Sequence, residues 1–357
     1  MTPKGMNVSM QILTSLRAWQ HSVVRTLVCA LFIGGTLPWS PATQANEASE
    51  RPKGHYRLPE EGNVVGESYT VKSHAEDTLL DIARQHNVGY NEIRRANPDV
   101  NVWVPGEGTE VVIPARHILP PGQREGVVIN VAELRLYYYP EVGEGEPPRV
   151  ETYPIGIGRE GYDTPLGVTK TTMRLEKPAW YPPQSMRKEA AARGESVPGV
   201  VPPGPDNPLG EYAILLDIPG YLIHGTNRPG GIGMRASRGC IRMYPEDIEA
   251  IFGRIPNGTQ VTIIEDPVKI GWDGEHAYVQ AFQPLEEQEQ GMSTLLETLA
   301  QLEGIPDISP AAVDYQQLHR LLEAPDGQVI ALLPPAPSSS DDSETTQPGG
   351  LYRYLAV

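Results

Sequence analysis

The feature of this chain that most restricts its fold is a series of short strand-forming segments between residues 122 and 265. Valine, isoleucine, leucine and tyrosine dominate these segments, and proline- or glycine-containing turns at 164–167, 208–210 and 256–258 separate them. The pattern predicts a mainly β domain with a folded, sandwich-like sheet. The predicted strands are 127–131, 134–139, 150–157, 168–173, 213–216, 221–224 and 261–264.

The same region contains one convincing helical segment, residues 245–252, with Pro245 in its first turn and two acidic residues near its positive end. Residues 176–207, the lid segment, are rich in Pro, Arg, Glu and Gly. We interpret them as a long ordered loop or lid over a binding face. Residues 266–333 form a C-terminal extension with a predicted strand pair and a short amphipathic helix, and residues 334–357 are predicted to be largely disordered.

The first 45 residues differ from the rest of the chain. They contain Lys and Arg but no Asp or Glu, and an apolar run at 26–39 precedes a small-residue site at 43–45. This order is typical of a secretory signal peptide that is cleaved after Ala45. A transmembrane anchor is the alternative, but the run is short and glycine and proline interrupt it. We therefore expect an exported mature chain without a transmembrane segment.

Charge and cysteine content narrow the functional classes. The formal net charge of −16 argues against a general nucleic-acid binder. Cys29 lies in the predicted signal peptide, so Cys240 is the one cysteine expected in the mature chain. Exported proteins usually pair their cysteines, and an unpaired thiol there is either buried or used. The polar Ser-Arg-Gly-Cys-Ile-Arg context favours a functional thiol over an inert buried one.

A histidine lies close to this cysteine in the sequence. His224 ends a predicted strand, Cys240 follows sixteen positions later, and glycines at 230–233 allow a tight chain reversal between them. A neighbouring imidazole can take the thiol proton and later return one to a leaving amine. His224 alone would more often be structural, but its pairing with an unpaired exported cysteine indicates a cysteine acyltransferase or hydrolase.

The groups that would assist this pair are less sharply indicated. Asp and Glu are absent between residues 218 and 245, so a backbone carbonyl is the candidate for orienting His224. The N–H groups around Gly239 and Cys240 could form an oxyanion hole. A metal site is the alternative, but one cysteine and one histidine fall short of the usual three or four zinc ligands. We therefore expect neither a metal nor another cofactor.

Four arginines surround the pair in an otherwise acidic chain. Arginine binds carboxylates with paired donors, so these residues predict an acidic substrate. Alternatively, some of them hold the loop by bonding to carbonyls or to Glu246 and Asp247. We expect Arg242 to shape the site and Arg238 to be more exposed to substrate. The four residues are Arg228, Arg235, Arg238 and Arg242.

Residues 67–115, the N-terminal unit, form a separate pattern of strand, helix, helix and strand, and the polar residues 46–66 before it are predicted to be a linker. The stretches 69–71, 77–79, 96–98 and 112–114 resemble a LysM module, a small βααβ fold of the α+β class. LysM modules bind N-acetylglucosamine-containing glycans, and the resemblance implies binding loops near 76–80 and 97–104. A packing domain that binds nothing is the alternative.

The motif at 224–225 and 237–243 closely resembles that of the YkuD-type L,D-transpeptidases, in particular the group with ErfK, YbiS, YcfS and YnhG. The resemblance implies a YkuD-like β-sandwich with short helices at 122–265. It also implies site roles. Cys240 matches the nucleophile, His224 the general base and acid, and the Gly225 carbonyl the group that orients the imidazole, while Ser237, Gly239 and Arg242 match the motif around the nucleophile. Arg238 stands where many members have histidine.

The implied function is that of a periplasmic peptidoglycan L,D-transpeptidase. In that family the cysteine attacks a stem tetrapeptide after meso-diaminopimelate, releases D-alanine and forms a thioester that an amine resolves. The acceptor could be diaminopimelate of a neighbouring stem, giving a 3→3 crosslink, or the C-terminal lysine of an outer-membrane lipoprotein. An L,D-carboxypeptidase, an endopeptidase and a non-catalytic peptidoglycan-binding scaffold are the alternatives. The implied partners are stem peptides and glycan strands.

Overall fold

The computed structural model describes residues 53–274, 276–285, 292–303 and 313–332. The predicted signal peptide (1–45) and the predicted disordered tail (334–357) lie outside these residues. In the described part of the chain, every helix is too short or too polar to cross a membrane.

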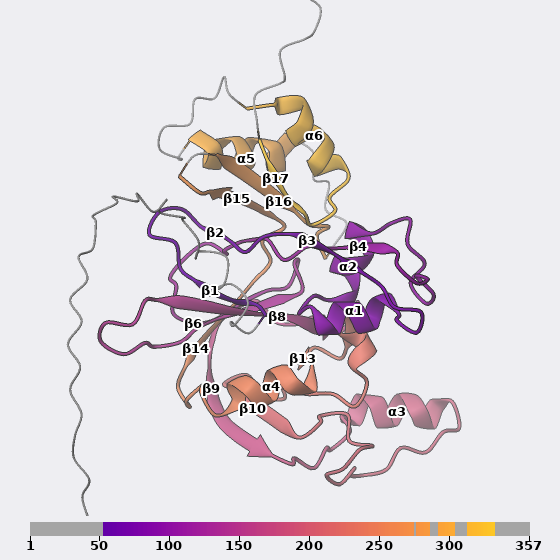
Figure 1. Ribbon diagram of the computed structural model, residues 1–357. Helices are drawn as coiled ribbons and strands as arrows, with labels where there is room; N and C mark the ends of the chain where they lie inside the picture. Colours follow the sequence, from indigo (N-terminus) through magenta and orange to yellow (C-terminus); the bar gives the residue numbers. More distant parts are fainter. Residues whose placement is uncertain (1–52, 275, 286–291, 304–312, 333–357) are drawn as a thin grey trace, which may run out of the picture. The chain divides into compact units, whose positions relative to one another are not determined.

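The main sheet closes on itself. Within the described residues it contains ten strands in the order β1-β8-β13-β11-β10-β9-β14-β6-β7, with β12 beside β8, and β8 also pairs with β7. Two ten-residue strands, β8 (Arg149–Gly158) and β9 (Gly167–Glu176), make the closure possible because each changes neighbours along its length. Figure 1 shows the long, curved course of β9. The other strands are β1 (His55–Arg57), β6 (Gly126–Asn130), β7 (Arg135–Tyr139), β10 (Tyr212–Leu216), β11 (Leu222–His224), β12 (Arg235–Ser237), β13 (Ile241–Met243) and β14 (Gln260–Ile264).

Alternate residues of these strands build one core. Val127 and Ile129 of β6, Leu136 and Tyr138 of β7, and Ile223 of β11 are all buried in it, as the two-residue period of a strand requires. Helix α4 (Pro245–Phe252) packs its apolar face against the same core and has the predicted bounds. The mainly β architecture with few helices is therefore confirmed.

The lid segment differs from its prediction as a loop, because it contains helix α3 (Gln184–Ala192). Its sequence, Gln-Ser-Met-Arg-Lys-Glu-Ala-Ala-Ala, consists largely of strong helix formers, and Pro183 precedes its first turn. The helix was not predicted because its sequence has no apolar stripe, and only Ala190 of α3 is buried. Composition, rather than periodicity, carried the signal.

The N-terminal unit has the predicted order β3 (Tyr69–Lys72), α1 (Leu79–Gln85), α2 (Tyr90–Ala96) and β4 (Glu110–Ile113). Thr78 caps α1 in a reciprocal box with Asp81. The buried Asn97 amide donates to the carbonyls of Ile93 and Val112, both at 2.8 Å, which ties the end of α2 to β4.

The described part of the predicted linker 46–66 is not a linker. Residues 55–57 form β1, which pairs with β8 at the edge of the main sheet, and β2 (Val64–Val65) pairs with β5 (His117–Ile118). The side chains of β1 are half-buried or exposed, so its sequence lacks a hydrophobic period. Backbone pairing holds this edge strand, and that signal is invisible in composition.

Several contacts join the N-terminal unit to the segments around the main sheet. The backbone N–H of Tyr90 donates to the Ile232 carbonyl at 3.1 Å, and Gly89 approaches Gly233 so closely that a Cβ on Gly233 would lie 2.5 Å from the Gly89 Cα. Arg84 binds Glu246 through two hydrogen bonds of 2.6 and 2.7 Å. The segment between His224 and Cys240 therefore packs on the start of α2.

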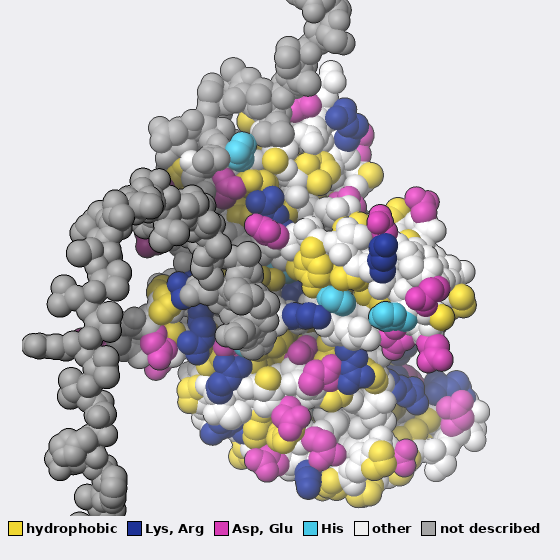
Figure 2. Space-filling model, in the orientation of Figure 1, with side chains coloured by type: hydrophobic (Ala, Val, Ile, Leu, Met, Phe, Trp, Pro, Cys, Tyr) yellow, Lys and Arg dark blue, Asp and Glu magenta, His cyan; other side chains and the backbone are white. Residues whose placement is uncertain are grey.

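The C-terminal extension contains the expected strand pair, β15 (Val268–Trp272) and β16 (Ala277–Ala281), and the expected helix, α5 (Met292–Glu303). Helix α6 (Tyr315–Glu323) and strand β17 (Val329–Ala331) add to it. A separate apolar cluster forms its core. On the face shown in Figure 2, acidic and basic side chains are interspersed over the described surface, so the negative charge is not gathered in one field there.

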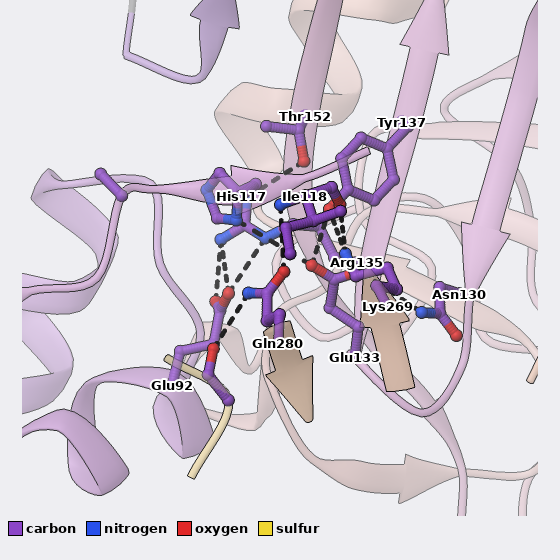
Figure 3. A network of polar contacts seen from close by, with 12 residues as sticks. Glu92, His117, Ile118, Asn130, Glu133, Arg135, Tyr137, Thr152, Lys269 and Gln280 are labelled. Atoms are coloured by element: carbon purple, nitrogen blue, oxygen red, sulfur yellow. Dashed lines mark hydrogen bonds and ion pairs between the residues drawn. The ribbon is translucent and has the colours of Figure 1, made fainter. Parts of the chain in front are cut away.

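A buried polar network connects these parts (Figure 3). Glu92 of α2 binds the fully buried Arg135 of β7 at 2.8 Å. Deeper in the network, Lys269 of β15 binds Glu133 at 2.7 Å, and the Tyr137 hydroxyl donates to the same carboxylate at 2.6 Å. Each charge is paired, which is the condition under which buried charges are tolerated.

Candidate active site

A parallel pair of short strands positions the candidate catalytic side chains. Strand β11 pairs with β13 so that Ile223 lies beside Ile241 and His224 beside Arg242. Because side chains alternate along a strand, the two isoleucines point into the core while His224 and Arg242 point to the opposite face. Cys240, one residue before β13, lies on that same face. The predicted approach of His224 and Cys240 thus results from strand pairing.

These side chains open into one cavity of about 580 Å³. Leu175 and Leu215 form part of its apolar wall, and Pro219 and Gly220 border it beside Cys240. The lid segment supplies a further wall. Its lining residues are Pro178, Ala179, Trp180, Tyr181, Pro183 and Met186. The cavity is therefore mostly apolar, with a thiol, an imidazole and two guanidinium groups at its polar side.

The His224 imidazole is held by backbone. Its Nδ1 lies 2.6 Å from the Gly225 carbonyl oxygen, which is the orienting contact predicted for Gly225. Burial lowers the pKa of His224 to about 4, and the positive charge of Arg242 acts in the same direction. Since a carbonyl only accepts hydrogen bonds, Nδ1 carries the proton and Nε2 is left with a lone pair.

The Cys240 thiol is partly buried and unpaired. Its Sγ lies 3.5 Å from the Gly220 carbonyl oxygen. Burial raises the pKa of this thiol above its ordinary value, although a backbone hydrogen bond with Leu222 and the charge of Arg242 act in the opposite direction. The cysteine and histidine are therefore both neutral near pH 7, and a proton must move during the reaction.

The turn before Cys240 is tightly bonded. The Ser237 hydroxyl donates to the Cys240 carbonyl at 2.6 Å, and the Thr164 hydroxyl donates to the Gly239 carbonyl at 2.9 Å. Gly239 has a φ of +101°, and a Cβ there would lie 2.7 Å from the Tyr221 ring. Ser237, which matches the motif around the nucleophile and was expected to bind substrate, lines the cavity and holds this turn through its hydroxyl.

The expected oxyanion-hole role of the Gly239 N–H conflicts with this geometry. That N–H already donates to the Ser237 hydroxyl at 3.1 Å. A donor held by a neighbouring side chain is not available to a developing oxyanion. The backbone N–H of Cys240 is the better candidate from the same turn.

Two arginines of the cavity, Arg238 and Arg242, have different surroundings. Arg238, expected to meet substrate, is bound by Glu189 of α3 through both terminal nitrogens. Arg242, expected to shape the site, lines the cavity as Arg238 does, and its buried Nε has no hydrogen-bond partner among the described residues. Arg235 binds Asp163 at 3.0 Å and holds the loop. Arg238 therefore has a carboxylate partner, whereas Arg242 has none among the described residues.

Residues that sequence reasoning did not identify also surround the site. Glu189, Tyr162 and Thr164 contact the Cys240 turn from segments 49 or more positions away in the sequence. Nothing in their local sequence marks them, because the contacts join segments that lie far apart in the sequence. Among the described residues, no three His, Cys, Asp or Glu side chains are grouped as metal ligands.

Comparison with known proteins agrees with this geometry. Residues 124–263 match a family model described as the YkuD L,D-transpeptidase catalytic domain. The chain is 46% identical over 218 residues to the probable L,D-transpeptidase ErfK/SrfK of Escherichia coli, covering 60% of this chain and 69% of that protein. It is 44% identical to the probable L,D-transpeptidase YcfS (65% and 73% covered) and 39% identical to the probable L,D-transpeptidase YbiS (72% and 87% covered), both of Escherichia coli. This chain belongs to the L,D-transpeptidase family.

Proposed function

We propose that this protein is a cysteine-dependent peptidoglycan L,D-transpeptidase. The observation that carries the proposal is the single cavity in which an unpaired thiol, a backbone-oriented imidazole and an unpaired guanidinium lie together. In the first step Nε2 of His224 takes the thiol proton as Sγ of Cys240 attacks the carbonyl carbon of diaminopimelate. The bond to D-alanine breaks, the imidazolium returns the proton to the leaving amine, and a thioester forms.

In the second step a primary amine attacks the thioester and gives up a proton to His224, and the thiol is regenerated. The Cys240 N–H would bind the oxyanion in both steps. Arg242 would bind a carboxylate of the stem peptide beside the reacting bond. Diaminopimelate of a neighbouring stem and the terminal lysine of an outer-membrane lipoprotein are the two amine acceptors of the proposal, and water would make the enzyme a carboxypeptidase.

The test is mass spectrometry of products after the protein meets a disaccharide-tetrapeptide, with and without a peptide that ends in lysine. We expect loss of D-alanine together with a dimer or a peptide adduct. Loss of D-alanine alone would identify a carboxypeptidase. If the unsubstituted protein formed no product that Cys240→Ala lacks, the proposal would be rejected in favour of a binding scaffold.

The pKa of His224 predicts the pH dependence. A general base must be neutral, and burial holds the pKa of His224 at about 4 instead of 6.5. The acid limb of kcat/KM should therefore fall near pH 4 to 5, as measured by D-alanine release between pH 4 and 8. Because the unfolded chain binds a proton near pH 6.5 and the folded protein does not, stability should also decline as the pH falls from 6.5 toward 4. An acid limb at pH 6.5 or above would contradict a neutral buried base.

We further propose that the N-terminal unit is a LysM module that binds glycan strands in the periplasm. Its two implied binding loops lie side by side, since the Leu79 N–H donates to the Val102 carbonyl at 2.9 Å. Trp103 and Val104 at the tip are 67% and 66% exposed, and the Asn101 side chain accepts from both of their N–H groups. An exposed tryptophan on a braced loop is suited to stacking on a sugar ring.

Replacing Trp103 with alanine should weaken co-sedimentation with purified sacculi by about tenfold, the usual loss when an aromatic anchor is truncated. Val168→Ala, which alters an equally exposed apolar residue on β9, is the matched control and should sediment normally. Point variants are preferable to deleting residues 46–115, because a deletion would also remove β1 from the main sheet and the Glu92 carboxylate that binds Arg135 of β7. Normal sedimentation of Trp103→Ala would contradict glycan binding by this loop.

A further inference from the structure

A carboxylate from a distant helix binds the arginine two residues before Cys240. Glu189 of α3 accepts hydrogen bonds from Nη1 of Arg238, at 2.9 Å, and from Nη2. The Tyr162 hydroxyl donates to the same carboxylate, and the Arg238 guanidinium lies 4.5 Å from the centre of the Tyr162 ring. A paired, charge-assisted contact of this kind fixes both the position and the orientation of a guanidinium.

The lid segment is anchored at its base by residues that precede and follow helix α3, which Figure 1 labels. The fully buried Asn207 amide donates to the carbonyls of Pro178, Val201 and Pro202. The backbones of Trp180 and Val201 also pair with each other. Helix α3 itself buries only Ala190, so apolar packing alone holds it weakly. Its position therefore depends on the contact that Glu189 makes.

The face of α3 that carries Glu189 also reaches the cavity. Met186, Glu189 and Ala190 are separated by three and four positions, which places them on one side of a helix. Met186 lines the cavity that contains Cys240, and Ala190 is buried. A displacement of Glu189 from Arg238 would therefore move a wall of the cavity as well as release a guanidinium.

We infer that Glu189 is a positioning residue that holds α3 as a wall of the cavity and occupies Arg238, so that Arg238 binds a substrate carboxylate only after Glu189 leaves it. Hydrogen bonds from Arg238 and Tyr162 hold the pKa of Glu189 at about 2, so the carboxylate keeps its charge at neutral pH. That the incoming carboxylate belongs to a stem peptide rests on the proposed function. The occupation of Arg238 does not.

Alkylation of Cys240 in the full-length protein tests the occupation of Arg238. Iodoacetate and iodoacetamide are similar in size, but only iodoacetate carries a carboxylate, and peptide mass spectrometry can follow both reactions at Cys240. In Glu189→Gln, Arg238 loses its anionic partner, so the ratio of the iodoacetate rate to the iodoacetamide rate should rise by about threefold. Glu195→Gln removes the exposed Arg193–Glu195 pair just beyond the end of α3 and should leave the ratio unchanged.

Two outcomes would overturn the inference. A ratio in Glu189→Gln equal to that of the unsubstituted protein would show that Glu189 does not restrict Arg238. Unchanged amide hydrogen exchange across residues 184–192 in Glu189→Gln, relative to Glu195→Gln, would show that the contact does not hold α3. Adding Arg238→Gln to Glu189→Gln should abolish the rise in the ratio. Because alkylation requires no transpeptidation, a protein that shows these effects but forms no exchange products would refute the proposed function alone.

Discussion

Replacement of Cys240 with alanine is expected to reduce D-alanine release from a disaccharide-tetrapeptide by about 10⁵-fold or more, which is the scale of loss when a covalent nucleophile is removed. The physical reason is that the Sγ atom forms the bond that replaces the peptide bond, and no other cysteine lies among the described residues. His224 and Arg242 would still line the cavity and bind substrate. We therefore expect kcat to collapse while substrate affinity, measured by calorimetry, changes little.

The companion variant is His224→Gln, which keeps a polar side chain of similar length but supplies no base. It should also lose most turnover, whereas the slow alkylation of its intact thiol at high pH should persist. Both variants should keep the circular dichroism spectrum of the parent protein. D-alanine release at the parental rate by Cys240→Ala would remove the nucleophile assignment.

Replacement of Lys269 with methionine is expected to destabilise the protein by about 3 to 5 kcal/mol, because it leaves the buried Glu133 without its cation. The Lys269 ammonium is buried and lies 2.7 Å from the Glu133 carboxylate, and it also donates to the Tyr137 hydroxyl at 3.2 Å. Burial lowers the pKa of Lys269, and the charge of Glu133 opposes that change. Chemical denaturation with matched slopes would measure the loss.

Lys170→Met provides the control, since the pair between Lys170 and Asp217 is 3.7 Å long and both side chains are more than half exposed. That variant should change stability by no more than about 0.5 kcal/mol. Adding Glu133→Leu to Lys269→Met should recover much of the lost stability, because the double variant no longer buries a lone charge. A loss below about 1 kcal/mol for Lys269→Met would mean that water reaches Glu133.

The parts of the fold that local sequence signals specify were predictable. Strand runs bounded by turns indicated β6 to β11 and β14, and α4 was predicted because Pro245 and the acidic first turn mark its start. The proximity of His224 and Cys240 followed from a strand end and a glycine-rich reversal. These inferences used residues within about twenty positions of one another.

Contacts between distant segments were not predictable from one sequence. Arg238 and Arg242 are the same residue type and lie four positions apart in the sequence. Their roles therefore depend on which side chains contact them in the folded protein. Glu189 occupies the first, and nothing among the described residues pairs with the second. Strand β1 was missed for a related reason, because its partner β8 begins 94 positions later than β1 does and its own side chains carry no period.

Tyr90 and Gly89 pack on the segment between His224 and Cys240, and this contact limits which stem peptides Cys240 can reach from a bound glycan strand. A binding module on a free tether lets an enzyme search a volume whose radius grows with tether length. Here no free tether separates the two, since His117 and Ile118, in the segment that joins them, pair with β2. If the N-terminal unit binds a glycan strand as proposed, the distance between its glycan-binding loops and Cys240 is fixed. Which stem peptides are crosslinked would then be decided by their spacing and helical phase along the strand.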